Sequence, residues 1–230
     1  MNDRKTALVT GADMGFGMFI ARNLEQQGWR VFATRIQKEY KLLEELKKKY
    51  PEIHPVWADI TKTDDIDRLK EEIEYFIDVT DIYVPGDDKR VGEGINVEAA
   101  VEAYHKNVSV PVANLEKVLN TMTGKKRICF LNTVKSSINY SEETSGFGHN
   151  MARAALNLIL VLTKNGLVEK GYTFRLFDPL ENQVDPGKAA KSALGYFTRD
   201  RFVDDPADGI GRNDEQNLVI RDALGRELPW

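Results

Sequence analysis

Short apolar runs alternate with longer amphipathic stretches along most of this sequence. The apolar runs predict strands at residues 7–9, 29–34, 54–59, 81–84, 127–132, 173–178 and 218–221. The amphipathic stretches predict helices at residues 18–27, 38–50, 64–77, 97–122, 145–170 and 186–196. Because strands and helices alternate at βαβ spacing, we expect one α/β domain over residues 1–230, with a doubly wound parallel sheet of about seven strands. Residues 217–230 predict a small hairpin at the sheet edge.

A glycine-rich turn lies between the first predicted strand and the first predicted helix. Its candidate ligand contacts are Gly11, Asp13, Met14, Gly15, Phe16 and Gly17. A turn of this kind brings a dinucleotide's pyrophosphate close to the backbone and onto a helix N-terminus, which favours negative charge. The pattern therefore predicts a Rossmann-type cofactor loop. An ordinary strand-to-helix turn is the alternative, because the spacing is G-x-x-x-G-x-G rather than G-x-G-x-x-G.

Residues near the ends of the second and third predicted strands indicate which dinucleotide is bound. An acid after the second strand bonds the ribose 2′-hydroxyl of NAD(H), whereas an arginine accommodates the 2′-phosphate of NADP(H). This chain has Arg35 there, so we expect NADP(H), with NAD(H) less favoured; a plain surface cation is the alternative. Asp59 and Ile60 close the third strand and are candidates to contact the adenine, although Asp59 is equally suited to cap the next helix.

Composition narrows the class of protein further. The net charge is −4 and no basic tract lies beside an aromatic stripe, so we expect no nucleic-acid partner. No apolar stretch approaches membrane-spanning length, so we expect no membrane partner. The N-terminus shows no signal peptide and the one cysteine, Cys129, lies in an apolar run, which predicts a cytoplasmic protein with a buried thiol. The three histidines fall on separate predicted elements and predict no metal site.

With these residues in view, the sequence resembles the short-chain dehydrogenase/reductase family over nearly its full length. The resemblance rests on T-G-x-x-x-G-x-G at residues 10–17, Asp59-Ile60 after the third predicted strand, and Asn107-Val108 in the long fourth helix. It implies an oxidoreductase that uses the dinucleotide to interconvert a small carbonyl compound and an alcohol. It also implies a homodimer or homotetramer.

The family's acid–base pair is altered in this sequence. Where members carry Y-x-x-x-K at the start of the fifth helix, this chain has His149 and Arg153. The four-residue spacing keeps the pair on one helix face. An imidazole, with an ordinary pKa of about 6.5, can exchange a proton near neutrality, and a guanidinium can bond the nicotinamide ribose. The alternative is a helix pair with no chemical role.

Other catalytic positions follow from the same resemblance. Thr133 aligns with the family's catalytic serine, although a short gap would place Ser136 or Ser137 there instead. Asn107 matches a fourth catalytic position, where a helix irregularity holds a water in a proton relay. Pro179 stands where the family has a turn beside the nicotinamide.

One segment departs from the family altogether. Members carry N-N-A-G after the fourth strand, and this chain has Pro-Gly-Asp-Asp at residues 85–88. The altered residues leave two functions open: an NADP(H)-dependent oxidoreductase with His149 as acid and base, or a catalytically silent NADP(H) sensor or scaffold. A methyltransferase is disfavoured by the glycine spacing and by Arg35 where an acid would be expected.

Overall fold

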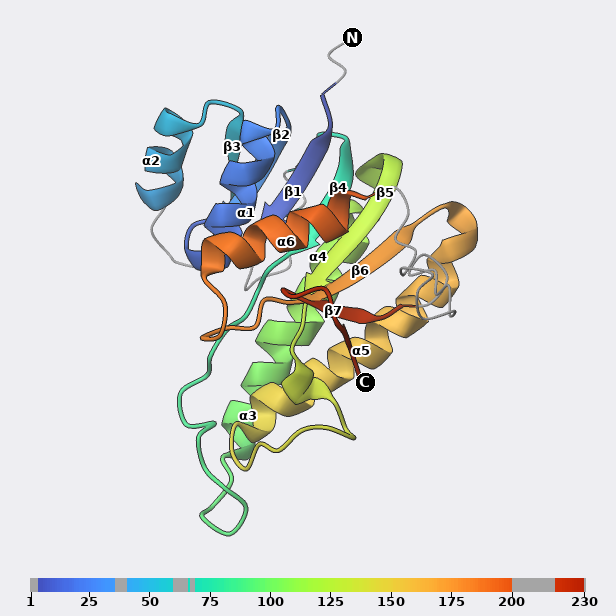
Figure 1. Ribbon diagram of the computed structural model, residues 1–230. Helices are drawn as coiled ribbons and strands as arrows, with labels where there is room; N and C mark the ends of the chain where they lie inside the picture. The colour runs from blue at the N-terminus through green and yellow to red at the C-terminus, as the bar shows by residue number, and fades with distance from the viewer. Residues whose placement is uncertain (1–3, 36–40, 60–65, 67–68, 200–217, 230) are drawn as a thin grey trace.

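Strand pairing in the computed structural model gives one continuous sheet (Figure 1). The structure describes residues 4–35, 41–59, 66, 69–199 and 218–229, without the side chains of residues 57 and 59. Within these ranges the strands are β1 (Thr6–Thr10), β2 (Arg30–Arg35), β3 (Ile53–Asp59), β4 (Ile73–Asp78), β5 (Met122–Leu131), β6 (Thr173–Asp178), β7 (Ile220–Asp222) and β8 (Glu227–Leu228). The helices are α1 (Gly15–Gln26), α2 (Lys41–Lys49), α3 (Val97–Tyr104), α4 (Val110–Val118), α5 (Phe147–Leu167) and α6 (Pro186–Thr198).

The strands lie in the order β3-β2-β1-β4-β5-β6-β7-β8, and all neighbours are parallel except β7 and β8. The strand order reverses at β1, which pairs with β2 on one side and β4 on the other. Ligands of open α/β sheets bind at such a switch point, outside the carboxyl ends of the strands. The doubly wound α/β fold predicted from the sequence is confirmed, with eight strands in place of about seven.

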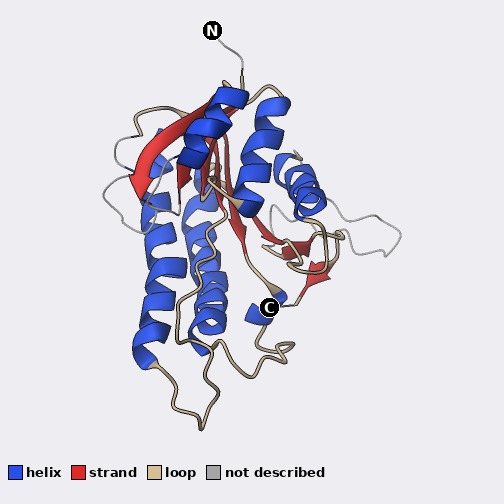
Figure 2. Ribbon diagram, turned by 90° about the vertical axis from the view of Figure 1, so that its left-hand side faces the viewer, coloured by secondary structure: helices blue, strands red, loops and turns tan. Residues whose placement is uncertain are grey.

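Helices cover both faces of the sheet (Figure 2). One face packs its apolar residues against α1, α2 and α6, and the other face packs against α4 and α5. Cys129 of β5 is fully buried in the first of these cores, as expected for a core thiol. Burial on both faces explains the short apolar runs within the central strands, such as residues 7–9 of β1, 75–77 of β4 and 128–131 of β5.

The fourth strand is not where the sequence pattern placed it. The helix expected through residue 77 is wrong, because Ile73–Asp78 forms β4 between β1 and β5; residues 60–65 and 67–68 lie outside the described ranges. The strand expected at residues 81–84 is also wrong, because this segment is loop. Burial decides the matter: Tyr75, Phe76 and Ile77 are at most 1% exposed, whereas Asp81 and Tyr83 are exposed.

The long fourth helix predicted at residues 97–122 is observed, but it is not one α-helix. Between α3 and α4 the chain forms a π-helical segment at His105–Ser109, which contains Asn107. Single π-turns inserted into α-helices are rare and occur frequently at functional sites. The helix irregularity that the family resemblance implied at Asn107 is therefore present.

The fifth helix lies within the predicted residues 145–170, but it is apolar enough over a long stretch to resemble a membrane span. Together with a following 3-10 turn, α5 covers Phe147–Lys170 and contains an 18-residue stretch with a mean hydropathy of 1.3, which meets the length and composition expected of a membrane span. The expectation that no stretch reaches this length is thus wrong. However, Ala152, Leu156 and Leu160 are buried against the sheet, so the helix forms a layer of this domain.

The C-terminal segment forms the hairpin expected at the sheet edge. β7 and β8 pair antiparallel, with Ile220 opposite Leu228. Leu228 packs against the core formed by β4, β5, α4 and α5. Residues 220–228 therefore form the edge of the sheet.

Candidate functional site

The loop after β1 leaves room for a dinucleotide at the start of α1. Gly11 and Gly15 adopt φ values of 64° and 53°, which favour glycine. A Cβ atom on Gly17 would lie 2.1 Å from the Gly11 carbonyl oxygen, so only glycine lets α1 begin this close to the loop. The side chain of the N-cap residue Met14 makes no capping hydrogen bond, and the first turn holds no acid. Backbone N–H groups at this end of α1 therefore suit an anionic group.

These glycines line a cavity of about 620 Å³, a volume within the range of about 300 to 1,000 Å³ that is typical of ligand sites. We call it the glycine-loop cavity; its wall includes Gly11, Met14, Gly15, Phe16, Gly17, Val79, Asp81 and Pro179. Asp13 is absent from this wall and is 1% exposed. Thr34 ties the loop to β2, because its Oγ1 and carbonyl oxygen accept from Gly11 N and Ala12 N at 3.3 and 2.9 Å.

The structure places the adenosine-side candidates at the carboxyl edge of β2 and β3. Arg35 is the last residue of β2, is partly exposed, and pairs in register with Asp59 of β3. The side chain of Asp59 is not described, and Ile60 lies outside the described residues. The cation and the acid therefore end neighbouring strands on the side of the sheet where ligands bind.

A second cavity of about 480 Å³ adjoins the first. We call it the histidine cavity, since its wall includes His149, Arg153, Thr133, Asn132 and Asp87. The residues that line both cavities are Asp81, Leu131, Pro179, Glu181, Asn182 and Gln183. The two cavities are thus parts of one cleft along the carboxyl ends of β1, β4, β5 and β6.

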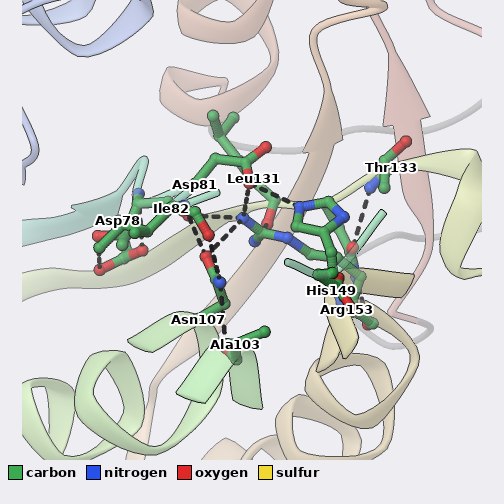
Figure 3. A network of polar contacts seen from close by, with 12 residues as sticks. Asp78, Asp81, Ile82, Ala103, Asn107, Leu131, Thr133, His149 and Arg153 are labelled. Carbon is green, nitrogen blue, oxygen red and sulfur yellow. Dashed lines mark hydrogen bonds and ion pairs between the residues drawn. The ribbon is translucent and has the colours of Figure 1, made fainter. Parts of the chain in front are cut away.

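Asp81 joins the two residues that replace the family's acid–base pair (Figure 3). His149 Nε2 lies 2.7 Å from Asp81 Oδ1, and Arg153 Nη2 lies 2.8 Å from the same oxygen. Partial desolvation raises the pKa of Asp81, whose side chain is 46% exposed, but the Arg153 guanidinium and the His149 hydrogen bond outweigh it and hold this pKa far below its ordinary value. Asp81 is therefore an ionised carboxylate at neutral pH.

Arg153 is fixed by acceptors from three other elements. Its guanidinium is 2% exposed and donates from Nη2 to Thr80 O at 2.8 Å and to Asn107 Oδ1 at 3.4 Å, and from Nη1 to Leu131 O at 3.4 Å. The cation connects the ends of β4 and β5, the π-helical segment and α5. Both Nη atoms of Arg153 already donate to protein oxygens.

Asn107 is 1% exposed and clamps the loop after β4 (Figure 3). Its amide accepts from Ile82 N and donates to Ile82 O, both at 2.8 Å, and also donates to Ala103 O at 3.0 Å. The π-turn therefore turns Asn107 from the helix toward the segment that carries Asp81. Asn107 lies next to Arg153, because its Oδ1 accepts from Arg153 Nη2 at 3.4 Å.

The three hydroxyl candidates after β5 do not lie in the same place. Thr133 lines the histidine cavity, whereas Ser136 and Ser137 are at most 2% exposed and line a neighbouring hollow of about 390 Å³. Ser136 Oγ donates to Thr133 O at 2.6 Å and accepts from Asn157 Nδ2 at 3.1 Å. Among the three, Thr133 is the hydroxyl that shares a cavity with His149.

Sequence reasoning missed two acids in the loop after β4. Because β4 ends at residue 78, the segment that directly follows it is Val79-Thr80-Asp81, not residues 85–88. Asp87, in the segment first aligned there, instead caps α5 from outside: its carboxylate accepts from Gly148 N at 2.6 Å and from His149 N at 2.7 Å. A correct C-terminal boundary for β4 would have placed Asp81 just beyond the carboxyl end of this strand, where ligands bind, and so would have identified it as a site residue.

Asp78 is a buried acid whose protonation is coupled to folding. It accepts from Thr10 Oγ1 at 2.7 Å and from Thr80 N at 3.0 Å, yet burial outweighs these bonds and raises its pKa. A raised folded-state pKa contributes stability that is present in acid and lost as pH rises through that pKa. We therefore expect Asp78→Asn to gain stability relative to the wild type as pH rises from about 4 to about 7. Urea unfolding of both proteins across this range tests this, and parallel stability curves would contradict it.

Comparison with known proteins identifies the family. A family model described as short chain dehydrogenase matches residues 5–127, which is more than half of the chain. Over 72 residues the chain is 40% identical to estradiol 17-beta-dehydrogenase 2 of Rattus norvegicus, a match that covers 31% of this chain and 19% of that enzyme. Over 242 residues it is 24% identical to an uncharacterized oxidoreductase of Saccharomyces cerevisiae, covering 99% of this chain and 93% of that protein.

Solved structures share the fold at lower identity. A carbonyl reductase from Pseudomonas aeruginosa in complex with NADP has a TM-score of 0.81 at 17% identity, covering 98% of this chain and 100% of that one. The carbonyl reductase Sniffer of D. melanogaster has a TM-score of 0.80 at 16% identity, covering 99% of this chain and 100% of that one. The match to more than half of the chain, on the fold described above, shows that this protein belongs to the short-chain dehydrogenase family.

Proposed function

We propose that this protein is an NADP(H)-dependent oxidoreductase that interconverts a small carbonyl compound and an alcohol. One observation carries the proposal: the glycine-loop cavity and the histidine cavity share a wall, so a cofactor in the first lies beside His149 and Thr133 in the second. The crystallised carbonyl reductase with bound NADP has the same fold, which supports this choice of cofactor.

In this proposal each part of the cleft has one task. The glycine loop holds the pyrophosphate, Arg35 meets the 2′-phosphate, and the end of β3 contacts the adenine. When bound, NADPH supplies the hydride. Thr133 donates a hydrogen bond that orients the carbonyl oxygen, and His149 gives that oxygen a proton.

Arg153 and Asn107 hold the other residues of the site in position. Because Arg153 is 2% exposed and donates to Thr80 O, Leu131 O and Asp81, we assign it to holding the site rather than to a contact with the nicotinamide ribose. Asn107 supports the same arrangement through its bonds to Ile82 and Arg153. Pro179 lines both cavities and places the loop after β6 against the cofactor.

The cofactor preference is tested at Arg35. Replacing it by leucine removes a charge-assisted contact to the 2′-phosphate, worth about 1.5 to 3 kcal/mol, so we expect NADPH to bind about 10- to 100-fold more weakly. NADH affinity should hardly change. Fluorescence titration with both cofactors measures this, and Arg30→Leu, at the other end of β2, is the matched control. Equal losses for NADH and NADPH would contradict the assignment.

A catalytically silent NADP(H) sensor is the second candidate. It is favoured by the contacts of His149 and Arg153, because both pair with the same carboxylate oxygen of Asp81 and Arg153 is 2% exposed. NADPH turnover against a panel of aldehydes, ketones, sugars and alcohols separates the two functions. Turnover that depends on His149 supports the oxidoreductase, whereas NADPH binding without turnover across the panel supports the sensor.

We also propose that the protein forms a homo-oligomer. Leu158 and Leu162 of α5 are 62% and 60% exposed one helical turn apart, and a subunit contact would bury this apolar stripe. Sedimentation of the wild type and of Leu158→Glu measures the assembly. A wild-type monomer at micromolar concentration would contradict the proposal.

A further inference from the structure

We propose that Asp81 is the positioning residue of His149: it accepts the Nε2 proton and leaves Nδ1 as the nitrogen that exchanges a proton with the substrate. The inference rests on the proposed oxidoreductase function and adds a residue that the sequence reading did not assign to the site. Its geometric basis is the 2.7 Å contact between His149 Nε2 and Asp81 Oδ1 (Figure 3).

The charge of Asp81 determines which nitrogen carries the proton. A carboxylate without a proton can only accept hydrogen bonds, so His149 Nε2 must donate to it. Arg153 Nη2, at 2.8 Å from the same oxygen, favours the ionised carboxylate and holds its pKa far below the ordinary range. The neutral imidazole is thereby restricted to the tautomer with hydrogen on Nε2.

The partners of His149 are themselves fixed. Arg153 donates hydrogen bonds to Thr80 O, Leu131 O and Asn107 Oδ1. These bonds hold its guanidinium in place, so the ion pair with Asp81 has a fixed position. Asp87 accepts from the backbone N–H of His149 at 2.7 Å, which sets where the helix presents the residue. One acid fixes the backbone of His149 and the other fixes its ring.

The proton balance follows from this arrangement. In carbonyl reduction the imidazolium gives its Nδ1 proton to the substrate oxygen as the hydride supplied by NADPH adds to the carbonyl carbon. The C=O π bond, the Nδ1–H bond of His149 and a C–H bond of the cofactor break, and the C–H and O–H bonds of the alcohol form. The carbonyl compound is reduced, NADPH is oxidised to NADP⁺, and the imidazole is left neutral with hydrogen on Nε2. Asp81 keeps its charge throughout and stabilises the imidazolium before transfer. The His149 side chain is 25% exposed, so water can restore its proton; alcohol oxidation runs the same steps in reverse.

The tautomer can be measured without any turnover. We would record ¹⁵N–¹H spectra of imidazole-labelled protein above neutral pH and assign the His149 signals by their loss in His149→Gln, since the chain has three histidines. The expected result is a protonated Nε2 and an unprotonated Nδ1 in the wild type. In Asp81→Ala both signals should move toward the average of the two tautomers, whereas Asp88→Ala, at an exposed acid of the same loop, should leave them unchanged.

Two further variants keep the test decisive. Asp81→Asn retains a neutral acceptor and should shift the signals less than Asp81→Ala does. If Asp81→Ala does not fold because the buried Arg153 loses its counter-charge, the double variant Asp81→Ala/Arg153→Met removes both charges and is measured instead. Hydrogen on Nδ1 in the wild type, or signals unaffected by loss of the Asp81 carboxylate, would overturn the proposal.

Kinetics separate this inference from the proposed function. On a carbonyl substrate found in the panel, Asp81→Ala should lower kcat about 10- to 100-fold with little change in KM, and Asp81→Glu should restore part of the loss. An equal loss of kcat in Asp81→Ala and Asp81→Glu would overturn the positioning role. A fixed tautomer in a protein with no turnover would overturn the oxidoreductase proposal and leave the contact between Asp81 and His149 standing.

Discussion

Replacing His149 by glutamine is expected to lower kcat about 10²- to 10⁴-fold, which is the range that general acid–base catalysis contributes. Glutamine keeps a polar side chain of similar reach but cannot exchange a proton near neutral pH. NADPH affinity should remain within about twofold of the wild type, because the glycine-loop cavity does not include His149. Steady-state oxidation of NADPH with a carbonyl substrate, alongside a direct binding titration, measures both quantities.

The control for this variant is His105→Gln, since His105 is exposed on the π-helical segment and faces neither cavity wall. It should retain wild-type turnover. An unchanged kcat in His149→Gln would remove His149 from the mechanism. A loss of NADPH binding in that variant would mean that the histidine supports the cofactor site instead.

Replacing Gly17 by alanine is expected to disrupt both the fold and cofactor binding. The added methyl group would lie 2.1 Å from Gly11 O and 2.7 Å from Val79 Cγ2, so the start of α1 must move away from the loop. Overpacking of this kind costs about 1 to 3 kcal/mol of unfolding free energy, and the displaced loop no longer presents its N–H groups to the pyrophosphate. Urea unfolding and NADPH titration measure the two effects.

Gly195→Ala provides the matched comparison in α6. A Cβ atom there meets nothing within 4 Å, and its φ is not in the left-handed region. This substitution should stabilise the protein by about 0.5 to 1 kcal/mol, because alanine is the better helix former. A Gly17→Ala protein as stable as Gly195→Ala, with normal NADPH affinity, would contradict the close packing of α1 on the glycine loop.

The features that sequence predicted well are those set by local patterns. The glycine loop follows a short apolar strand and precedes an amphipathic helix, and the structure has β1, the turn and α1 in that order. Residues 173–178 were placed to the residue, because a short segment containing Phe174, Leu176 and Phe177 lies between the turn residues Gly171 and Pro179. These patterns involve residues that are adjacent in the sequence, so they do not depend on how the rest of the chain packs.

The fourth strand was misplaced for a reason that is not local. Acids at residues 71, 72 and 74 give the stretch before Asp78 a helical appearance, and only its pairing with β1 and β5 makes it a strand. This error hid Asp81, since the residue was read as the start of a strand. The partners of His149 and Arg153 could not be read from the sequence, because they depend on which backbone segments meet at the carboxyl edge of the sheet.

Asn107 shows how far a family motif can lead. The resemblance implied a helix irregularity at this residue, and the π-turn at His105–Ser109 confirms it. The motif did not indicate that the Asn107 amide would bond both the N–H and the carbonyl of Ile82, nor that Arg153 would reach its oxygen. These contacts follow from tertiary packing of the loop after β4.

The central claim, hydride transfer in the shared cleft, is tested most directly with NADPH that carries deuterium at the nicotinamide C4. The wild-type protein would be incubated with the labelled cofactor and a panel of aldehydes and ketones, and the products analysed by mass spectrometry. We predict an alcohol that carries deuterium on its carbinol carbon, formed by the wild type and far more slowly by His149→Gln. Bound NADPH with no labelled alcohol from any member of the panel would contradict the account.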